Sequence, residues 1–218
     1  MLAKKRGKCY GIWAENPSKR RKGGCSVTVV ILAGGQSRRM GRDKLRLTLG
    51  GETLLARAIR RYSEVFPCVL VSVAGPEKFP ELGDRRVFDA FPGAGPLAGL
   101  HAGLLASGED VFLTGADMPF SSPEKALLLT SLCGEKDACV LTDGAGRWEP
   151  LFGYYRPSVL PRAAELLSSG RRSMGALLAS VSLREVSLVE LGEGPDSLIT
   201  RNVNVPEDYE KLRLELGE

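Results

Sequence analysis

Histidine is almost missing from this chain, and the shortage removes several classes of enzyme. His101 is the one histidine among 218 residues, so no grouping of histidine and cysteine at zinc-ligand spacing is available. Ser-His-Asp and Cys-His nucleophilic schemes would all depend on that same residue. We interpret His101 as a structural or surface residue inside a glycine-rich segment.

Cysteine is scarce as well and follows no pattern. The number is odd and no C-x-x-C pair occurs, which is not the composition of a disulfide framework or of a zinc site. We therefore expect reduced thiols at all five positions, which are Cys9, Cys25, Cys68, Cys133 and Cys139.

Long hydrophobic runs are absent too. No run approaches the roughly 20 apolar residues that cross a bilayer, and the basic N-terminus lacks the apolar region of a secretory signal. The chain has 43% hydrophobic and 26% charged residues, which lies in the globular range. We expect a soluble, cytoplasmic protein with no membrane partner.

Positive charge is concentrated at one end of the chain. Residues 1–26 hold eight basic residues and one acidic residue, so they carry +7 and residues 27–218 carry −3 of the total of +4. A nucleic-acid-binding domain concentrates basic charge on a folded face, so we expect no nucleic-acid partner. Residues 1–26 also lack hydrophobic periodicity. We predict a basic, flexible extension over 1–26 and a single domain over 27–218.

The rest of the sequence alternates between strand and helix patterns. An unbroken run of β-branched and apolar residues at Val27–Ala33 predicts a strand buried on both faces, and Thr53 is expected to cap an amphipathic helix that extends to Val65. Further strands are expected at Cys68–Ala74, Arg86–Phe88, Asp110–Thr114, Ala138–Thr142, Pro150–Tyr155 and Leu183–Leu188. Further helices are expected at Leu97–Ala106, Pro123–Leu132, Pro157–Ser168, Met174–Ala179 and Pro206–Leu216.

This alternation predicts an α/β fold of three layers, Rossmann-like, with a mainly parallel sheet. Ligands of such sheets gather beyond the carboxyl ends of the strands. The loops that follow the expected strands are therefore the place to look for a site.

The loop after the first expected strand has the composition of an anion-binding loop. Gly34 and Gly35 let backbone N–H groups approach a phosphate where a Cβ would collide. Arg38, Arg39 and Lys44 add cationic donors around the same anion. Neither the Walker pattern G-x-x-x-x-G-K-[ST] nor the dinucleotide pattern G-x-G-x-x-G occurs here. A solvated basic turn is the alternative, and the position at a strand terminus disfavours it.

The segment LAGGQSRRMGRDK, from Leu32 to Lys44, closely resembles the signature L-A-G-G-x-S-x-R-M-G-x-D-K of nucleotidyltransferases that act on the molybdenum cofactor. The resemblance extends over residues 27–212. It includes four further motifs in order, which are Asp89 before the loop Gly95–Gly99, Ala116–Pro119, Glu149–Phe152 and Asn202–Asp208. The chain thus resembles the molybdenum cofactor guanylyltransferase family.

The resemblance implies a nucleotidyltransferase fold and a reaction in which GMP from GTP is joined to the terminal phosphate of molybdopterin, with release of pyrophosphate. Displacement at an α-phosphate needs no covalent enzyme nucleophile, because positioning and charge neutralisation suffice. GTP and molybdopterin are then the substrates. Other cofactor-biosynthesis proteins or molybdoenzyme chaperones are the implied protein partners.

The site residues follow from the residue types together with the resemblance. Arg38 and Lys44 are the catalytic candidates for the triphosphate. Asp117 ends an apolar run, where a carboxylate faces the ligand edge, and it is the candidate Mg²⁺ ligand. The resemblance adds nucleotide contacts at Leu32, Ala33, Gly34, Gly35, Lys44, Asp89, Gly95, Pro96, Leu97 and Asp117.

Several of these positions have structural alternatives. Asp117 is the candidate N-cap of the helix near Pro123 in one alternative, and Asp89 is an Asx-turn residue in another. Ser72 aligns with a nucleotide-contacting asparagine of some relatives. For the pterin, the candidates are Arg171 with Arg172, whose alternative is the solvated end of a helix, and Asn202 with Asn204, whose alternative is a turn.

Two other functions are open. A sister group transfers CMP to the same cofactor, but it usually has alanine where Gly35 stands and lacks the aspartate at Asp43, so these residues favour GTP. The second is a non-catalytic module that carries a nucleotide or pterin. Lys44 and Asp117 argue against it, because a carrier needs no metal site.

Overall fold

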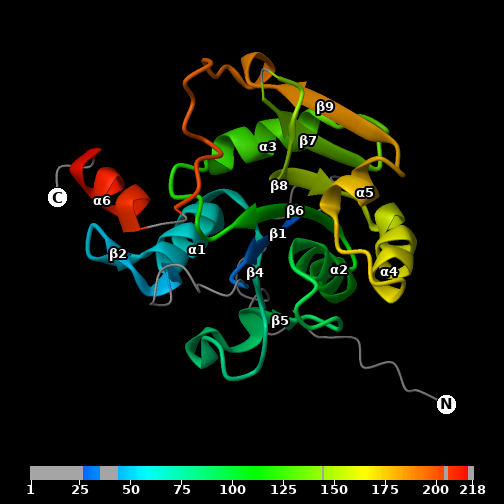
Figure 1. Ribbon diagram of the computed structural model, residues 1–218, viewed down its shortest axis with the longest axis horizontal. Helices are drawn as coiled ribbons and strands as arrows, with labels where there is room; N and C mark the ends of the chain where they lie inside the picture. The colour runs from blue at the N-terminus through cyan, green and yellow to red at the C-terminus, as the bar shows by residue number, and fades with distance from the viewer. Residues whose placement is uncertain (1–26, 35–43, 144, 204–205, 216–218) are drawn as a thin grey trace.

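Seven strands form one sheet at the centre of the molecule (Figure 1). The computed structural model describes residues 27–34, 44–143, 145–203 and 206–215. Across the sheet the order is β5 (Arg86–Phe88), β4 (Cys68–Val73), β1 (Val27–Leu32), β6 (Asp110–Gly115), β8 (Trp148–Tyr155), β7 (Ala138–Thr142) and β9 (Leu183–Ser187). The predicted Rossmann-like α/β class with a mainly parallel sheet is confirmed, because β8 alone among these strands runs antiparallel to its neighbours.

The strand β1 lies inside the sheet and is not an edge strand. It pairs with β4 on one edge and with β6 on the other. Val29, Val30 and Ile31 are fully buried, as expected of a strand that helices cover on both faces. The predicted strand is confirmed, and it ends at Leu32.

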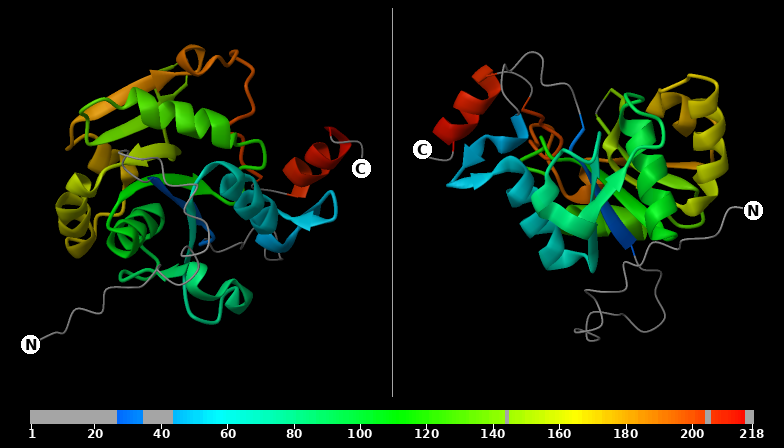
Figure 2. Two further views of the ribbon diagram at one scale, coloured as in Figure 1. Left: turned by 180° about the vertical axis from the view of Figure 1, so that it is seen from behind. Right: turned by 90° about the horizontal axis from the view of Figure 1, so that it is seen from below.

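Helices cover both faces of the sheet and complete the three layers. On one face, α1 (Leu54–Val65) and α3 (Pro123–Leu132) pack in a cluster that includes Ile31. On the other face, α2 (Pro96–Ser107), α4 (Leu160–Ser168) and α5 (Met174–Leu178) pack in a cluster that includes Val30. Figure 2 shows the two groups of helices on opposite sides of the sheet. These boundaries agree with the predicted helices to within one residue at each end, except that the segment Pro157–Ser168 divides into η4 (Pro157–Val159) and α4.

The helix α1 begins as the sequence predicts. Thr53 has extended backbone angles, and its hydroxyl accepts a hydrogen bond of 3.2 Å from the Ala56 N–H. Leu54, Leu55 and Tyr62 lie on its buried face. This cap satisfies one of the free N–H groups at the helix start.

A hairpin that the sequence analysis did not anticipate precedes α1. Its strands are β2 (Thr48–Leu49) and β3 (Glu52–Thr53). Gly50 and Gly51 both have positive φ angles, of 63° and 74°, which is the requirement of a tight two-residue turn between twisted strands. The C-terminal helix α6 (Pro206–Glu215) lies beside this hairpin (Figure 1), and the Tyr209 hydroxyl donates to the Thr48 carbonyl.

The helix α2 approaches the sheet unusually closely, and two glycines allow it. A Cβ at Gly99 would lie 2.3 Å from Leu32 Cδ2, and a Cβ at Gly103 would lie 2.4 Å from Val30 Cγ2. The glycine-rich composition of this helix therefore reflects its packing on β1. As a result, the start of α2 is held next to the end of β1.

Short helical segments and the chain termini complete the description. The 3₁₀ segments are η2 (Lys44–Arg46), η3 (Pro80–Arg85), η4 and η5 (Val189–Leu191). None of the helices in the described residues is long and apolar enough to cross a membrane. The predicted extension over residues 1–26 lies outside the described residues.

Candidate active site

The carboxyl ends of β4, β1 and β6 are bound to one another just beyond the strands. The Ala33 N–H donates to the Ser72 carbonyl at 2.9 Å, and the Ala116 N–H donates to the Leu32 carbonyl at 3.2 Å. The backbone at Leu32 and Ala33 is therefore fixed between two neighbouring strands. Gly34 follows, and no atom of the described residues lies within 4 Å of the place where its Cβ would stand.

The remainder of the anion-binding loop is only partly described. Gly35 and Arg38, with the neighbouring Arg39 and Asp43, lie outside the described residues. Lys44 begins η2, and its side chain lies outside the described part. The roles predicted for these residues therefore stay predictions.

The carboxylate of Asp117 folds back over the end of β6. A Cβ at Gly115 would lie 2.4 Å from Asp117 Oδ1, so the glycine leaves the space that this oxygen occupies. The alternative role of Asp117 as a helix cap is wrong, because Ser122 is the N-cap of α3 and accepts from the Lys125 N–H at 3.2 Å. Asp117 therefore lies at the carboxyl edge of the sheet, which is the edge where ligands of such folds bind.

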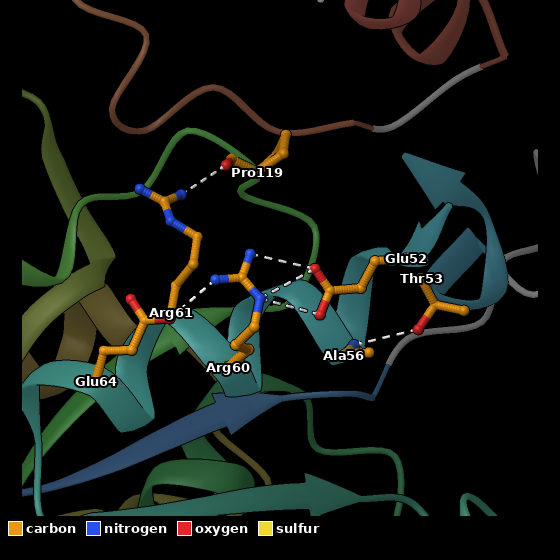
Figure 3. A network of polar contacts seen from close by, with 7 residues as sticks. All are labelled: Glu52, Thr53, Ala56, Arg60, Arg61, Glu64 and Pro119. Atoms are coloured by element: carbon orange, nitrogen blue, oxygen red, sulfur yellow. Dashed lines mark hydrogen bonds and ion pairs between the residues drawn. The ribbon is translucent and has the colours of Figure 1, made fainter. Parts of the chain in front are cut away.

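Hydrogen bonds connect the loop after Asp117 to α1. Arg61 Nη1 donates to the Pro119 carbonyl at 2.9 Å (Figure 3), and the hydroxyls of Tyr62 and Ser121 are hydrogen-bonded to each other. On the other side, the Val203 N–H donates to the Asp117 carbonyl at 2.9 Å. Hydrogen bonds from α1 and from Val203 thus fix the backbone at and after Asp117.

Glu149 is a second carboxylate near Asp117, and the sequence analysis gave it no role. Burial raises the pKa of Glu149, and the negative charge of Asp117 raises this pKa further. Its Oε1 accepts a hydrogen bond of 3.1 Å from the Leu151 N–H. The residue stands near the start of β8, and because β8 is antiparallel its first residues lie at the ligand edge. The signal that could have found it was the acidic residue in the motif Glu149–Phe152.

Asp89 is joined to β4 through its side chain. Ser72 Oγ donates a hydrogen bond of 3.0 Å to Asp89 Oδ1. Burial raises the pKa of Asp89, and the Ser72 hydrogen bond partly opposes this effect. Within the described residues, the Asx-turn alternative is supported by no hydrogen bond. Asp89 is thus placed by the neighbouring strand, on the same edge as Ala33.

Side chains of Arg172 and His101 contact the loop between Asp89 and α2. Gly95 has a φ of 72° and precedes Pro96, the first residue of α2. Arg172 Nη1 donates to the Gly93 carbonyl at 3.1 Å, and the rings of Phe91 and His101 meet edge to face with centroids 5.4 Å apart. Gly95, Pro96 and Leu97 are thereby positioned next to the end of β1.

His101 and Arg172 both contact the loop that precedes α2. His101 is 7% exposed, and burial lowers its pKa, so its interpretation as a structural residue is confirmed. The guanidinium of Arg172 reaches the loop at Gly93 rather than remaining solely at the end of a helix. Arg171 Nε donates to Ser169 Oγ at 3.4 Å. Pterin binding by either arginine stays a prediction.

The comparisons with known proteins identify the family of this chain. A family model described as the MobA-like NTP transferase domain matches residues 29–186. A protein of Carboxydothermus hydrogenoformans named "Probable molybdenum cofactor guanylyltransferase" is 33% identical over 86% of this chain and 95% of its own length. The chain belongs to the molybdenum cofactor guanylyltransferase family. Another protein with this name, from Opitutus terrae, is 36% identical over 84% of this chain and 93% of its own length.

Solved structures agree on the fold of the family. A molybdopterin-guanine dinucleotide biosynthesis protein A from Archaeoglobus fulgidus superposes with a TM-score of 0.76 at 24% identity, over 87% of this chain and 98% of the other. A cytidylyltransferase for 2-C-methyl-D-erythritol 4-phosphate from Thermus thermophilus superposes with a TM-score of 0.62 at 19% identity, over 88% of this chain and all of the other. These likenesses establish a nucleotidyltransferase fold.

The guanylyltransferase site offers hard oxygen donors of the kind that Mg²⁺ prefers. Among the described residues, no three His, Cys, Asp or Glu side chains gather as a metal-binding group. Asn202 Oδ1 is buried and has no hydrogen-bond partner within the described part of the chain. Asn202 directly precedes Val203, whose N–H donates a hydrogen bond to the Asp117 carbonyl. Carboxylate and amide oxygens completed by substrate phosphates and water suit Mg²⁺. Asn204 lies outside the described residues.

Cys68, Cys133 and Cys139 are free thiols, as the sequence predicts. Cys9 and Cys25 lie outside the described residues.

Proposed function

We propose that this chain transfers GMP from GTP to the terminal phosphate of molybdopterin, which yields molybdopterin guanine dinucleotide and pyrophosphate. The observation that carries the proposal is the likeness to proteins named molybdenum cofactor guanylyltransferases, at 33% and 36% identity over most of both chains. The geometry supports it, because hydrogen bonds link the ends of β4, β1 and β6 just beyond the strands, and the Asp117 carboxylate follows β6 at the same edge of the sheet.

The donor nucleotide occupies the side of the site that β5, β4 and β1 form. The backbone of Leu32, Ala33, Gly34 and Gly35 cradles GTP, and Asp89 accepts hydrogen bonds from the nucleotide. The start of α2, at Gly95, Pro96 and Leu97, offers backbone groups to the guanine edge. Lys44 and Arg38 neutralise the triphosphate, since two polyanionic substrates must approach each other.

The acceptor phosphate is itself the nucleophile of this reaction. One of its oxygens forms a bond to the α-phosphorus of GTP while the bond from that phosphorus to the bridging oxygen breaks, and pyrophosphate leaves with the electron pair. The protein supplies position and charge, which account for most of the catalysis of phosphoryl transfer. Asp117 would hold Mg²⁺, and Asn202 Oδ1 and Glu149 are nearby oxygen donors. When bound, the ion neutralises charge that develops on the phosphates.

The test is a side-by-side assay of nucleotides. With the purified chain, molybdopterin and Mg²⁺, we expect GTP to give the dinucleotide product and pyrophosphate with a kcat/KM at least about tenfold above that of CTP. Preference for CTP would overturn the guanylyl assignment. GTP binding without any turnover would favour the carrier module instead.

We also propose a domain organisation, a cellular location and protein partners for this enzyme. The residues from 27 onward act as one catalytic domain, with residues 1–26 as an extension, in the cytoplasm. Other cofactor-biosynthesis proteins or molybdoenzyme chaperones supply the pterin or receive the product.

A further inference from the structure

Two successive turns follow the end of β6 and carry Asp117. The Met118 N–H donates to the Gly115 carbonyl at 3.3 Å, and the Ser121 N–H donates to the Met118 carbonyl at 3.1 Å. These bonds leave the carbonyl groups of Asp117 and Pro119 to partners outside the turns. Because a buried carbonyl group needs a partner, the position of this loop depends on the groups that supply one.

Arg61 of α1 supplies the partner of the Pro119 carbonyl. Its Nη1 donates a hydrogen bond of 2.9 Å across 58 residues of sequence, and Figure 3 shows the side chain extending from the helix toward the loop. Pro119 is buried, and a hydrogen bond from a charged donor is stronger than one between neutral groups. Since proline has no N–H, its carbonyl is the backbone group through which a hydrogen bond can hold it. The bond thus determines where the residue two positions after Asp117 lies.

The next residue of α1 makes a second bond to the same loop. The hydroxyl groups of Tyr62 and Ser121 are hydrogen-bonded to each other, and both residues are 2% exposed. Two consecutive residues of the helix therefore hold the loop at two positions, Pro119 and Ser121. Two points of attachment fix the orientation of the loop as well as its position.

The helix α1 also holds the segment that follows Lys44. The N–H of Leu54, at the start of the helix, donates to the Leu47 carbonyl at 3.0 Å, and Leu47 comes directly after η2, which Lys44 begins. One helix is thus bonded both to the segment beside the predicted phosphate-binding lysine and to the loop of the predicted Mg²⁺ ligand, Asp117. Its geometry sets how these two parts of the site lie relative to each other.

We propose that Arg61 is a positioning residue for the carboxylate of Asp117, because its bond to the Pro119 carbonyl holds the loop of Asp117 on α1. The inference rests on the proposed function, which assigns Mg²⁺ binding to Asp117. Arg61 touches no substrate in this role and acts through the backbone of the loop. The precision that it supplies matters, since a displacement of about 1 Å in a positioned group costs about 100-fold in rate.

Arg61→Met and Arg60→Met form a matched pair of full-chain variants. Each removes one guanidinium from the same helix and leaves an unbranched side chain. Arg61→Met removes the bond to the loop of Asp117, whereas Arg60 pairs with Glu52 and Glu64 (Figure 3). The pair therefore separates the loss of this bond from the loss of a positive charge on α1.

The first measurement is metal binding without turnover. Mn²⁺, followed by electron paramagnetic resonance in place of Mg²⁺, is titrated into each chain with bound guanosine 5′-[α,β-methylene]triphosphate, whose reacting bond cannot be cleaved. We expect Arg61→Met to bind Mn²⁺ about tenfold more weakly than the wild type, as when a group that orients a metal ligand is removed. Arg60→Met should bind Mn²⁺ within about twofold of the wild type, and both variants should bind the analogue alone within about twofold.

The second measurement is turnover with GTP, molybdopterin and Mg²⁺. We expect Arg61→Met to lower kcat about tenfold and to raise the half-saturating Mg²⁺ concentration by a similar factor, while the KM for GTP stays within about twofold. Arg61→Lys keeps a cationic donor for the single carbonyl and should recover most of both losses. Tyr62→Phe removes the second bond from α1 and should raise the Mg²⁺ requirement as well, so it provides the test if thermal melting shows that Arg61→Met does not fold.

The outcomes distinguish this inference from the proposed function. If folded Arg61→Met binds Mn²⁺ and turns over like the wild type, or if Arg60→Met loses as much, Arg61 does not position Asp117 and the inference is overturned. If Arg61→Met loses as much affinity for the analogue alone as for Mn²⁺, Arg61 acts on the nucleotide, which also overturns the inference. If the wild type forms no dinucleotide but Mn²⁺ binding still weakens in Arg61→Met alone, the positioning role is supported and the proposed function fails.

Discussion

Gly115 leaves the space into which the carboxylate of Asp117 folds, with Asp117 Oδ1 2.4 Å from the position that a Cβ of Gly115 would take. A side chain at Gly115 would displace the carboxylate from the end of β6. The smallest possible change at this glycine therefore tests whether the orientation of Asp117 matters.

We expect Gly115→Ala to lower kcat about 100-fold, because a displacement of about 1 Å in a positioned group is enough for such a loss. GTP affinity should change little. The measurement is steady-state turnover, with Gly194→Ala as the matched control, since a Cβ at Gly194 meets nothing within 4 Å. An alanine variant with wild-type kcat would show that Asp117 tolerates movement.

Asp117→Asn should abolish turnover while GTP still binds. The amide keeps the size of the carboxylate but loses the charge that would hold Mg²⁺, so we expect a loss of at least about 1,000-fold in kcat. Turnover is measured over a range of Mg²⁺ concentrations, and GTP affinity by calorimetry. Asp84→Asn, at an exposed position in η3, is the control. Unchanged turnover would remove Asp117 from the mechanism.

Lys44→Ala should weaken GTP binding by about 10- to 100-fold, as expected when a charge-assisted contact to phosphate is lost. GMP, which lacks the outer phosphates, should lose much less affinity. Arg46→Ala serves as the control, because the Arg46 guanidinium lies over the Phe79 ring at 5.2 Å. Equal affinity of the Lys44 variant and the wild type for GTP would contradict the phosphate-binding role.

Ser72→Ala should shift the pH dependence of GTP binding upward. Burial raises the pKa of Asp89, and the hydrogen bond from Ser72 lowers it by favouring the ionised form. Without that hydrogen bond, the pKa of Asp89 rises further. If ionised Asp89 accepts from GTP, affinity is lost as the pH falls through this pKa, so the loss begins at a higher pH in the variant. GTP titrations between acid and neutral pH measure it, and an identical profile would show that Asp89 does not contact the nucleotide in its ionised form.

Thr53→Ala should destabilise the protein by about 1 kcal/mol, because the Ala56 N–H loses its partner at the start of α1. Thr53→Ser keeps the hydroxyl and should retain most of the stability. Urea unfolding measures both variants. A Thr53→Ala midpoint equal to that of the wild type would mean that water replaces the cap at no cost.

Periodicity predicts the buried elements of this fold well and its small additions poorly. The strand at Val27–Leu32 could be predicted from its own residues, because a short run of β-branched and apolar residues is typical of a strand that is buried on both faces of a sheet. The β2–β3 hairpin has strands of two residues each, which are too short for any periodic pattern. Its signal was the pair Gly50 and Gly51, which favours a two-residue turn.

The direction of β8 also carried a signal in the sequence. Only five residues, 143–147, separate β7 from β8, and a parallel crossover needs a dozen or more. In the site, the resemblance identified Asp117 and Asp89. Glu149 stands in one of the matching motifs, but its nearness to Asp117 arises from the pairing of β6 with β8, so the motif alone did not indicate its role. Contacts between strands that are distant in the sequence have no local pattern from which they could be predicted.

The reversed direction of β8 has a consequence for how such enzymes diversify. Trp148 and Glu149 reach the carboxyl edge of the sheet from the beginning of a strand, directly after the turn that joins β7 to β8. Insertions or replacements in the turn between β7 and β8 can therefore change this part of the edge while the parallel pairing of β4, β1 and β6 is kept. A protein built in this way can vary one part of its carboxyl edge without rebuilding its central strands.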